Sequence, residues 1–560
     1  MTDRRPNHRS QALSRLTRPG RSGWVLALAT VVAIAFLAAG CSTVATTAGG
    51  ASATIGNEGT PVDGGDLVVA VDNDTSGWNP HDNQWAQAGS MVGSSVLEPL
   101  ATTDADLDAA PWLAESWTPN ATFDSYTIVL RTGVTFQNGQ PLDAAALKLN
   151  IDDASTAGLS GVAIKGLIKL VTVVDDHTVR VDLAQPWAAF PSSFLNGQSA
   201  MMMAPAMLSS PTRGSDHPIG TGPYTFVSWQ PGATFKATKN VSYWQAGLPH
   251  LDGIEFQVLA DGSAQAAALR SGDVNLLFTS RPSSANTLAS QYTVIKDWGS
   301  EPGMAMTNTI PIVKGSPNPM SNQHARLALA YATDREALAS AAGDGVQSPS
   351  SPFPPTSKWG LPDDQNGYVS FDLDQAKAQV ALYEQDTGAS SLSIILSSPA
   401  GVDMARLTQL LQSQWNEAGI DTSIDASEAT SFITNVVSGA YQVAIFNIYS
   451  SPDPDQNHYF WSADTAKGAG QVSINFTQLT NPQMEADLKT GRESNDFATR
   501  KAAYDDLVHE INTQAVNIWT FSTPYSLIAS PKVHGFQQPS KVPFGNFQPK
   551  TWLGDLWLSP

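Results

Sequence analysis

Pro218-Ile-Gly-Thr-Gly-Pro-Tyr-Thr-Phe226 is the stretch that decides the fold, and Trp229-Gln-Pro-Gly232 and Asn240-Val-Ser-Tyr-Trp244 follow it closely. The two glycines permit positive φ and the proline fixes the backbone after them, so a tight turn is predicted to lead into a strand over 224–227. The stretch is no phosphate-binding loop, because its glycine spacing is wrong and no Lys-Ser/Thr pair follows. It therefore indicates an architecture rather than a chemistry.

Four further blocks stand around this stretch. They are Leu97-Glu-Pro-Leu100, Pro111-Trp-Leu-Ala-Glu-Ser-Trp117, Leu130-Arg-Thr-Gly-Val-Thr-Phe-Gln-Asn-Gly-Gln-Pro-Leu142 and Arg326-Leu-Ala-Leu-Ala-Tyr-Ala-Thr-Asp-Arg335. Asp143 is expected near a helix N-cap, and Asp334 with Arg335 is expected to form a structural ion pair. Together the blocks resemble the extracytoplasmic solute-binding proteins of ABC importers, family 5, typified by dipeptide- and oligopeptide-binding proteins. The resemblance runs from about Gly64 to Phe536.

Apolar residues along the chain follow two different periods. Short β-branched runs predict strands at 66–71, 126–130, 171–181, 254–259, 274–278, 393–396 and 442–447. Helical spacing predicts helices at 143–152, 263–271, 322–341, 373–384, 404–418, 481–489 and 498–513. Strands that alternate with helices favour an α/β architecture with mixed sheets.

The resemblance implies a two-lobed periplasmic-binding-protein fold of type II, with three domains and a hinge. Domain I would combine residues 64–100, 218–303 and 520–560, domain II would span 101–217, and domain III would span 304–519. The two chain crossings between the lobes would form the hinge, near Met304 to Asn308 and near Trp519 to Pro524.

The N-terminus has the layout of a secretory signal. Six arginines precede an apolar run that begins at Trp24, and Leu37-Ala-Ala-Gly-Cys41 resembles the bacterial lipobox. Residues 1–40 are therefore predicted to be a lipoprotein signal peptide, Cys41 the lipidated residue, and residues 41–63 a flexible tether. The alternative is a signal-anchor helix with an incidental cysteine. In the first case the protein would be exported and held by lipid at the outer face of the cytoplasmic membrane.

Composition excludes several classes of function. The formal net charge of −20 disfavours nucleic acid as a partner, because such partners require clustered Lys and Arg. With Cys41 as the one cysteine, the chain has no internal disulfide, thiolate nucleophile or cysteine metal site. The sequence implies no metal and no cofactor. A monomer is expected, and transport would require separate permease and ATPase subunits because no nucleotide-binding motif is present.

Candidate ligand contacts lie where strands are expected to end at the cleft. The resemblance implies an aspartate that binds the ligand's amine shortly before an Asp-Pro-Asp, but in Asn447-Ile-Tyr-Ser-Ser-Pro-Asp-Pro-Asp455 that position falls on Ser450. A missing charge disfavours dependence on a free amine. The ligand would then be an N-blocked or non-peptide solute, an ordinary peptide bound without this charge, or one bound by a shifted Asp453. The full candidate set is Trp78, Trp85, Asn308, Asn447, Tyr449, Ser450, Asp453 and Trp519.

Three competing interpretations stay open. An exported hydrolase is disfavoured because no Gly-x-Ser-x-Gly or His-Glu-x-x-His motif appears, although paired carboxylates are compatible with the sequence. A calcium loop at Asp453, Asp455, Asn457 and Asp464 is disfavoured because His458 stands where glycine is required. A receptor that signals without transport would have the same binding chemistry. The predicted function is capture of an oligopeptide, dipeptide or related solute outside the membrane for delivery to a permease.

Overall fold

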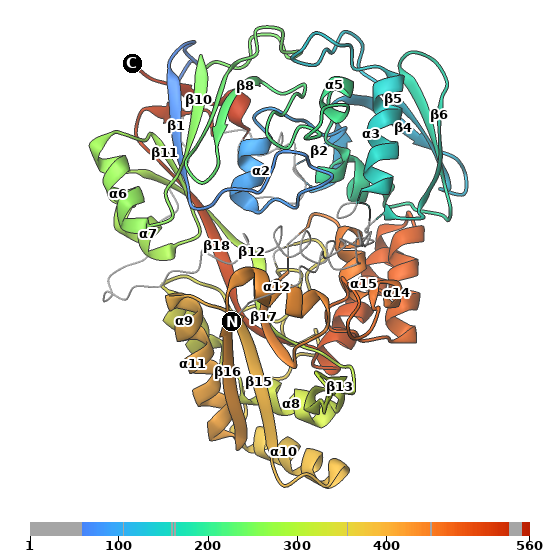
Figure 1. Cartoon of the computed structure of the whole chain (residues 1–560), viewed down its shortest axis with the longest axis vertical. Coiled ribbons are helices and arrows are strands. Elements are labelled where there is room, and N and C mark those ends of the chain that lie inside the picture. Colours follow the sequence, from blue (N-terminus) through green and yellow to red (C-terminus); the bar gives the residue numbers. More distant parts are fainter. Residues whose placement is uncertain are drawn as a thin grey trace, which may run out of the picture.

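The protein has two lobes, which lie above and below the middle of Figure 1. The computed structural model describes residues 59–104, 106–157, 161, 164–355, 357–448, 451–536 and 552–560. The upper lobe holds the elements from β1 (Asp66–Val71) to β11 (Leu276–Thr279) and the end of the chain. The lower lobe holds the elements from β13 (Ile312–Val313) to α15 (Phe497–Thr513). The predicted α/β architecture with mixed sheets is confirmed.

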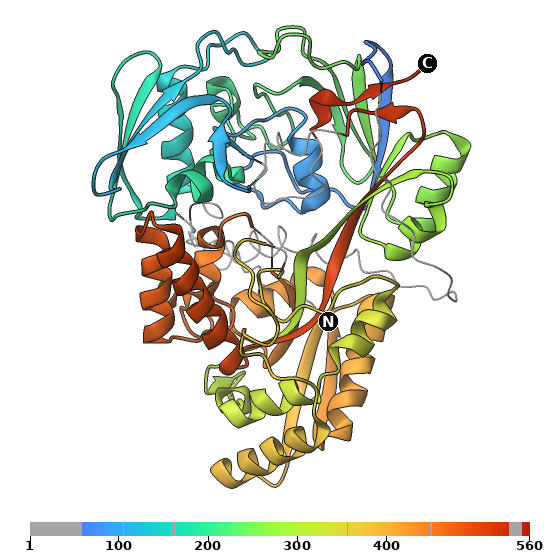
Figure 2. The same ribbon diagram turned by 180° about the vertical axis from the view of Figure 1, so that it is seen from behind.

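One sheet of ten strands runs through both lobes in the order β16-β15-β17-β12-β18-β11-β1-β10-β9-β8. Its upper part contains β1 (Asp66–Val71), β8 (Tyr224–Gln230), β9 (Thr234–Lys239), β10 (Gly253–Val258) and β11 (Leu276–Thr279). Its lower part contains β15 (Leu392–Pro399), β16 (Ile420–Ser427) and β17 (Val443–Asn447). Two long antiparallel strands, β12 (Thr293–Thr307) and β18 (Asn517–Ala529), join the parts, as Figures 1 and 2 show from opposite sides.

The pairing of β12 with β18 is irregular where the strands pass between the lobes. Its register shifts between Asp297 and Glu301 and again between Pro302 and Met304. Interrupted pairing leaves a strand locally bent. These irregularities adjoin the two segments that the sequence suggests as hinges.

A second sheet of four strands lies at the far side of the upper lobe. It has the order β4-β5-β7-β6, with β4 (Ala114–Pro119), β5 (Ser125–Leu130), β6 (Ile168–Val173) and β7 (Thr178–Leu183). Helix α3 (Ala144–Thr156) begins beside it, and Asp143 caps that helix by accepting a bond from the Ala146 amide at 2.8 Å, as expected. The single strand predicted at 171–181 is wrong, because a turn around 174–177 divides it into β6 and β7.

Helices surround the sheets. In the upper lobe they are α2 (Gln87–Gly93), α5 (Pro205–Leu208), α6 (Gly262–Ser271) and α7 (Pro282–Leu288). In the lower lobe they are α8 (Gln323–Ala332), α9 (Arg335–Ala342), α10 (Leu373–Thr387), α11 (Val402–Glu417), α12 (Ala429–Val437), α13 (His458–Trp461), α14 (Pro482–Glu493) and α15 (Phe497–Thr513). No helix among the described residues has the length and apolarity that a membrane span requires.

The helix predicted at 322–341 is two helices. Helix α8 ends at Ala332, and Asp334 caps α9 by accepting a bond from the Ala337 amide at 2.9 Å. The expected ion pair between Asp334 and Arg335 is therefore wrong: the guanidinium of Arg335 donates to the Pro349 carbonyl at 2.6 Å and lies over the ring of Tyr368. A carboxylate that satisfies free amides of a new helix is used for capping, not for pairing with its neighbour.

A buried carboxylate draws the sequence blocks of the upper lobe together. Glu98 is fully buried and accepts hydrogen bonds from four neutral groups. The donors are Trp112 Nε1 at 2.9 Å, Thr221 Oγ1 at 2.8 Å, Tyr243 OH at 2.7 Å and Trp244 Nε1 at 3.1 Å. Burial raises the pKa of Glu98 to about 7, against the effect of these bonds. Four blocks that are separate in the sequence thus meet at one side chain.

Gly220 and Gly222, in the stretch 218–226, allow two backbone segments to pack closely against each other. A Cβ at Gly220 would lie 2.2 Å from the Val96 carbonyl oxygen, and one at Gly222 would lie 2.6 Å from the Val96 carbonyl carbon. Neither glycine has positive φ, so the conformational reason given from the sequence is wrong. The predicted strand is confirmed, because β8 begins at Tyr224.

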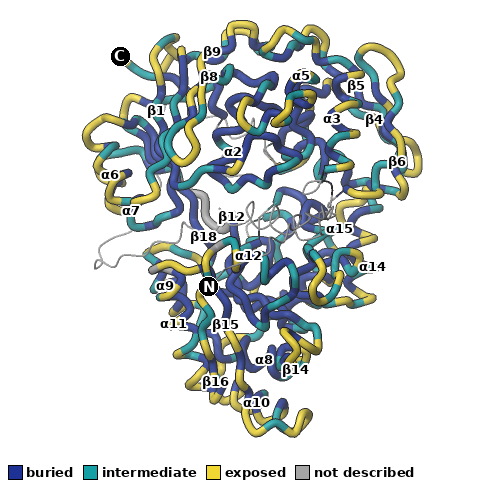
Figure 3. The backbone as a smooth tube through the Cα atoms, in the orientation of Figure 1, coloured by how far each residue is buried: buried dark blue, intermediate teal, exposed yellow. Residues whose placement is uncertain are grey.

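The core is divided between the lobes. Figure 3 shows buried backbone along the strands of the large sheet and exposed backbone on the outer helices and loops. A large and a small apolar cluster lie in the upper lobe, the small one around Leu277. Two clusters lie in the lower lobe, around Trp415 and Trp519. Each lobe therefore has a core of its own, as movement about a crossing requires.

Candidate functional site: the cleft at the lobe crossing

Strands of both lobes end at the crossing of β12 and β18. In the upper lobe, β1 and β11 run parallel to each other and end at Val71 and Thr279. In the lower lobe, β17 runs parallel to β15 and ends at Asn447, opposite Gly303 of β12. Ligands of open α/β sheets bind outside the carboxyl ends of parallel strands. The crossing is therefore the candidate site of this fold.

Glu301 of β12 lies between the lobes and is 3% exposed. Tyr525 OH of β18 donates to its Oε2 at 2.6 Å, and Gln87 Nε2 of the upper lobe donates to its Oε1 at 3.4 Å. Asn447 of the lower lobe also hydrogen-bonds it. Burial raises the pKa of Glu301 to about 7, and the charge of Asp72 adds to this effect.

Asp72 stands directly after β1 and is buried as well. Its Oδ2 accepts bonds from the Ser280 amide at 3.2 Å and from Ser280 Oγ at 3.0 Å. Burial raises the pKa of its carboxyl. Among the side chains that the structure describes, no lysine, arginine or histidine forms a salt bridge with Asp72 or Glu301. The crossing thus carries two buried acids without a basic partner in contact.

Helix α2 presents two buried polar atoms that no described group satisfies. Gln87 Oε1 and Ser90 Oγ have no hydrogen-bond partner among the described residues, although Gln87 and Ser90 are 2% and 1% exposed. Residues three apart lie on one face of a helix. Gln87 reaches Glu301 through its other amide atom, so this face lies next to the crossing.

The lobes touch directly through the turn at 452–457. Asp455 Oδ2 accepts a bond at 2.6 Å from Nε1 of Trp187 in the upper lobe, and its Oδ1 accepts one at 2.8 Å from Nε of Arg492 in α14. Asp453 accepts a bond from Ser192 of the upper lobe at 2.6 Å and pairs with Arg500 of α15 at 2.7 Å. We call these six residues the interlobe contact. Burial opposes ionisation of Asp455, but Arg492 and His458 hold its pKa below the usual value.

Asp453 is thus engaged by a guanidinium and a hydroxyl. In this arrangement its carboxylate joins the lobes to each other. The turn also explains the acids that suggested a calcium loop. Asp455 faces Arg492, and no group of three or more metal-ligating side chains occurs in the described ranges.

Trp78 and Trp85 lie inside the upper lobe, 1% and 0% exposed. Their ring centroids are 6.0 Å apart, and Trp85 Nε1 donates to the Gly77 carbonyl at 2.9 Å. Asn308 and Trp519 are fully buried in the lower lobe. Asn308 Nδ2 donates to the Gly439 and Tyr441 carbonyls, and Trp519 Nε1 donates to Asn512. Ligand contacts by these four side chains stay predictions.

Asn447 is the candidate that the structure brings to the crossing. Its Nδ2 donates to Thr523 Oγ1 of β18 at 3.1 Å. Tyr449, Ser450 and Cys41 lie outside the described residues. Sequence reasoning missed Glu301, Gln87, Arg492 and Arg500. The one hint at Glu301 was its place shortly before the hinge predicted near Met304 to Asn308, in a stretch for which no strand was predicted.

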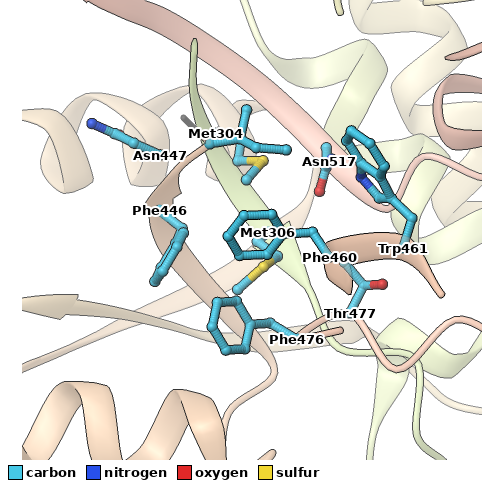
Figure 4. A pocket seen from close by; sticks show the side chains of 10 residues that line it. Met304, Met306, Phe446, Asn447, Phe460, Trp461, Phe476, Thr477 and Asn517 are labelled. Carbon is cyan, nitrogen blue, oxygen red and sulfur yellow. The ribbon is translucent and has the colours of Figure 1, made fainter. Parts of the chain in front are cut away.

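A small apolar pocket lies below the crossing (Figure 4). Its apolar lining residues are Met304, Met306, Phe446, Ile448, Phe460, Trp461 and Phe476, and its polar ones are Asn447, Thr477 and Asn517. Its cavity volume is about 20 Å³. Because one water needs ≳10–15 Å³, the pocket has room for about one water and none for a peptide. It is a packing space of the lower lobe, not the solute site.

Comparisons with known proteins agree with this geometry. The sequence profile of the bacterial extracellular solute-binding proteins, family 5, middle region, matches residues 108–470. The glutathione-binding protein GsiB of Pectobacterium atrosepticum is 26% identical over 490 residues, 84% of this chain and 91% of that protein.

Two solved structures show the same fold. The ABC transporter-associated periplasmic binding protein DppA of Helicobacter pylori, in complex with the peptide STSA, has a TM-score of 0.74, 20% identity, and coverage of 89% of this chain and 98% of its own. AgaA of A. tumefaciens R10, in complex with agropinic acid, has a TM-score of 0.74, 20% identity, and coverage of 89% and 99%. Since the family profile matches more than half of the sequence, the chain belongs to the bacterial extracellular solute-binding proteins of family 5.

Proposed function

We propose that the chain is the solute-binding component of an ABC importer, and that it captures a peptide or a peptide-like solute between its lobes. The observation that carries the proposal is that strands of both lobes end at one crossing, in a protein of the family 5 fold. The relatives named above bind glutathione and a peptide, according to their descriptions. Permease and ATPase subunits would complete the importer.

The proposed mechanism is capture and delivery. Solute enters the open cleft, closure buries it against both lobes, and the closed form docks on the permease. A ligand favours closure only through its higher affinity for the closed state. Domains I, II and III move as units, with hinges near 304–308 and 519–524, and the irregular β12–β18 pairing supports this placement. Asn447, Tyr449 and Ser450 are proposed as contacts on the lower side of the cleft.

A second candidate is a non-peptide solute. The uncharged Ser450 favours it, and AgaA shows that a protein of this fold binds agropinic acid. The binding mechanism would be the same, and the identity of the bound mass distinguishes the two candidates.

Native mass spectrometry of residues 42–560, before and after denaturation, tests the proposal. Co-purified peptide masses would support peptide capture, and a single non-peptide mass would support the second candidate. X-ray scattering of the stripped protein should show a smaller radius of gyration when the identified ligand is added back. An unchanged radius at saturation would exclude closure as the mechanism.

We also propose that Cys41 carries the lipid anchor and that the mature chain is held at the outer face of the cytoplasmic membrane. The support is the lipobox-like Leu37-Ala-Ala-Gly-Cys41 after an arginine-rich segment. Cys41→Ala should release the protein into the medium or leave an unprocessed precursor. Normal lipid labelling of that variant would refute the assignment.

A further inference from the structure

The acids at the crossing lack the partner that buried acids normally have. Charged groups are almost never fully buried unless they are paired or hydrogen-bonded throughout. The partners of Glu301 are Gln87, Asn447 and Tyr525, all neutral. Asp72 accepts bonds from Ser280 and Asn73, which are neutral as well. Arg281 donates to the Ala260 carbonyl and forms no salt bridge with Asp72, although its charge acts to lower the pKa of that carboxyl.

The interlobe contact is a useful comparison within the same molecule. There the buried acids Asp453 and Asp455 each have a guanidinium, from Arg500 and Arg492. Burial is equally complete at Glu301, yet no described guanidinium or ammonium lies within salt-bridge distance of it. Glu98 of the upper lobe also has no described cation within salt-bridge distance, but it accepts bonds from four donors. Glu301 differs because the buried acceptor beside it, Gln87 Oε1, has no donor among the described residues.

The side-chain oxygen of Gln87 would also be satisfied by a group that donates hydrogen bonds. Its Nε2 donates to Glu301, so its Oε1 is an acceptor that faces no described donor. Against the ionised carboxylate of Glu301, the opposite orientation of the amide would place two acceptors against each other, so the ionised form fixes this one. An unpaired buried acceptor beside an unpaired acid is a place for a group with several donors and a positive charge. A primary ammonium has three donors and no acceptor.

We infer that Glu301 and the side-chain oxygen of Gln87 receive the primary ammonium of a peptide-like solute at the crossing. The inference rests on the proposed function, since it assumes that the solute is bound between the lobes. Gln87 belongs to the upper lobe and Asn447, the neighbour of Glu301 on the other side, to the lower. An ammonium bound here is enclosed from both lobes, and its binding is coupled to closure.

Two probe peptides that differ in one group test this inference. Ala-Ala-Ala has a free ammonium, and N-acetyl-Ala-Ala-Ala has none. Calorimetric titration of wild-type residues 42–560 should show tighter binding of the free peptide by at least about tenfold, because hydrogen bonds to charged groups contribute about 1.5–3 kcal/mol. Glu301→Gln should bring the ratio of the two dissociation constants close to one. The matched control is Glu115→Gln, which removes the same charge at an exposed position of β4 and should keep the ratio.

A pH series separates ligand contact from a structural role. Burial raises the pKa of Glu301 to about 7, so the carboxyl is protonated in the free protein at pH 5.5 and must release its proton to bind an ammonium. Affinity for Ala-Ala-Ala should therefore fall between pH 7.5 and 5.5 in the wild type and change little in Glu301→Gln. The peptide's own amine, with a pKa of about 8, stays charged over this range. Asp72 and Tyr525 are the other titratable groups that act on Glu301, and both remain in the variant.

The outcomes are distinguishable. Equal binding of the two peptides by the wild type, or a preference that persists in Glu301→Gln, overturns the role of Glu301 and leaves solute capture standing. If the wild type binds neither peptide, peptide capture is overturned, and the inference falls with it. Because the readout is a ratio within each folded sample, partial loss of stability in a variant does not imitate either result.

Discussion

Glu98 shows how one side chain organises a lobe. Its four donors come from segments that begin near residues 111, 218 and 240. Glu98→Ala would strand these donors in the core, and each unsatisfied buried group costs about 1–3 kcal/mol. We expect the variant to lose at least about 3 kcal/mol of unfolding free energy in urea. Glu115→Ala, at an exposed position of β4, should lose much less; equal losses would contradict the account.

The same residue predicts a pH dependence. Glu98 has a pKa of about 7 in the folded protein and 4.5 as the ordinary value, so the folded state holds the proton longer than the unfolded state. Its contribution to stability is complete below pH 4.5 and is lost as the pH rises to about 7, up to about 3 kcal/mol. Glu301 acts in the same direction. The urea midpoint should therefore drop less between pH 5 and pH 8 in Glu98→Gln than in the wild type; identical drops would show that the carboxyl is ionised throughout.

The sequence provides only indirect evidence that Glu98 is a buried acceptor shared by several segments. The blocks around Leu97, Trp112 and Gly220 were recognisable, but their common purpose was not, because distant segments that meet at one carboxylate leave no periodic trace. The role of Glu301 was even less apparent from the sequence than that of Glu98. An acidic residue followed by proline and glycine, as in Glu301-Pro302-Gly303, is typical of a loop. Its charge is unusual only because the structure places it in a buried strand.

Strands β12 and β18 connect the two lobes, and neither was predicted from the sequence. Pro302 and Pro524 interrupt their sequences, and proline is rare in central strands. The structure tolerates these prolines where the pairing is irregular, at the crossing itself. Shorter strands that are continuous apolar runs, such as β1 and β17, were located within a residue or two.

Close packing at the crossing gives a test of this element. A Cβ at Gly303 would lie 2.6 Å from the Phe521 carbonyl oxygen, and backbone cannot move aside cheaply. We expect Gly303→Ala to cost about 1–3 kcal/mol in thermal unfolding. Gly401→Ala is the matched control, because a Cβ there meets nothing within 4 Å. A Gly303→Ala melting curve that matches the control would show that the strands can separate at this point.

At the scale of the whole molecule, the interlobe contact adds to closure without any solute. Trp187→Phe removes the indole N–H that donates to Asp455, but Asp455 keeps Arg492 as a partner. We expect the ligand-free variant to have a larger radius of gyration in X-ray scattering than the wild type. Trp415→Phe also removes one buried indole bond, to Thr333, entirely inside the lower lobe. A radius that increases equally in both variants would point to loosened packing instead of lobe opening.

The strand order of the large sheet also determines when this sheet can be completed during synthesis of the chain. Strand β18 comes near the end of the chain but lies between β11 and β12 in the middle of the sheet. Until residues 517–529 have left the ribosome or crossed a membrane, β11 and β12 have no partner on their facing edges. Unpaired edges of this length invite pairing with other chains. A factor that shields the incomplete chain would therefore be needed until its last forty or so residues arrive, which makes late truncations far more harmful than the small number of missing residues suggests.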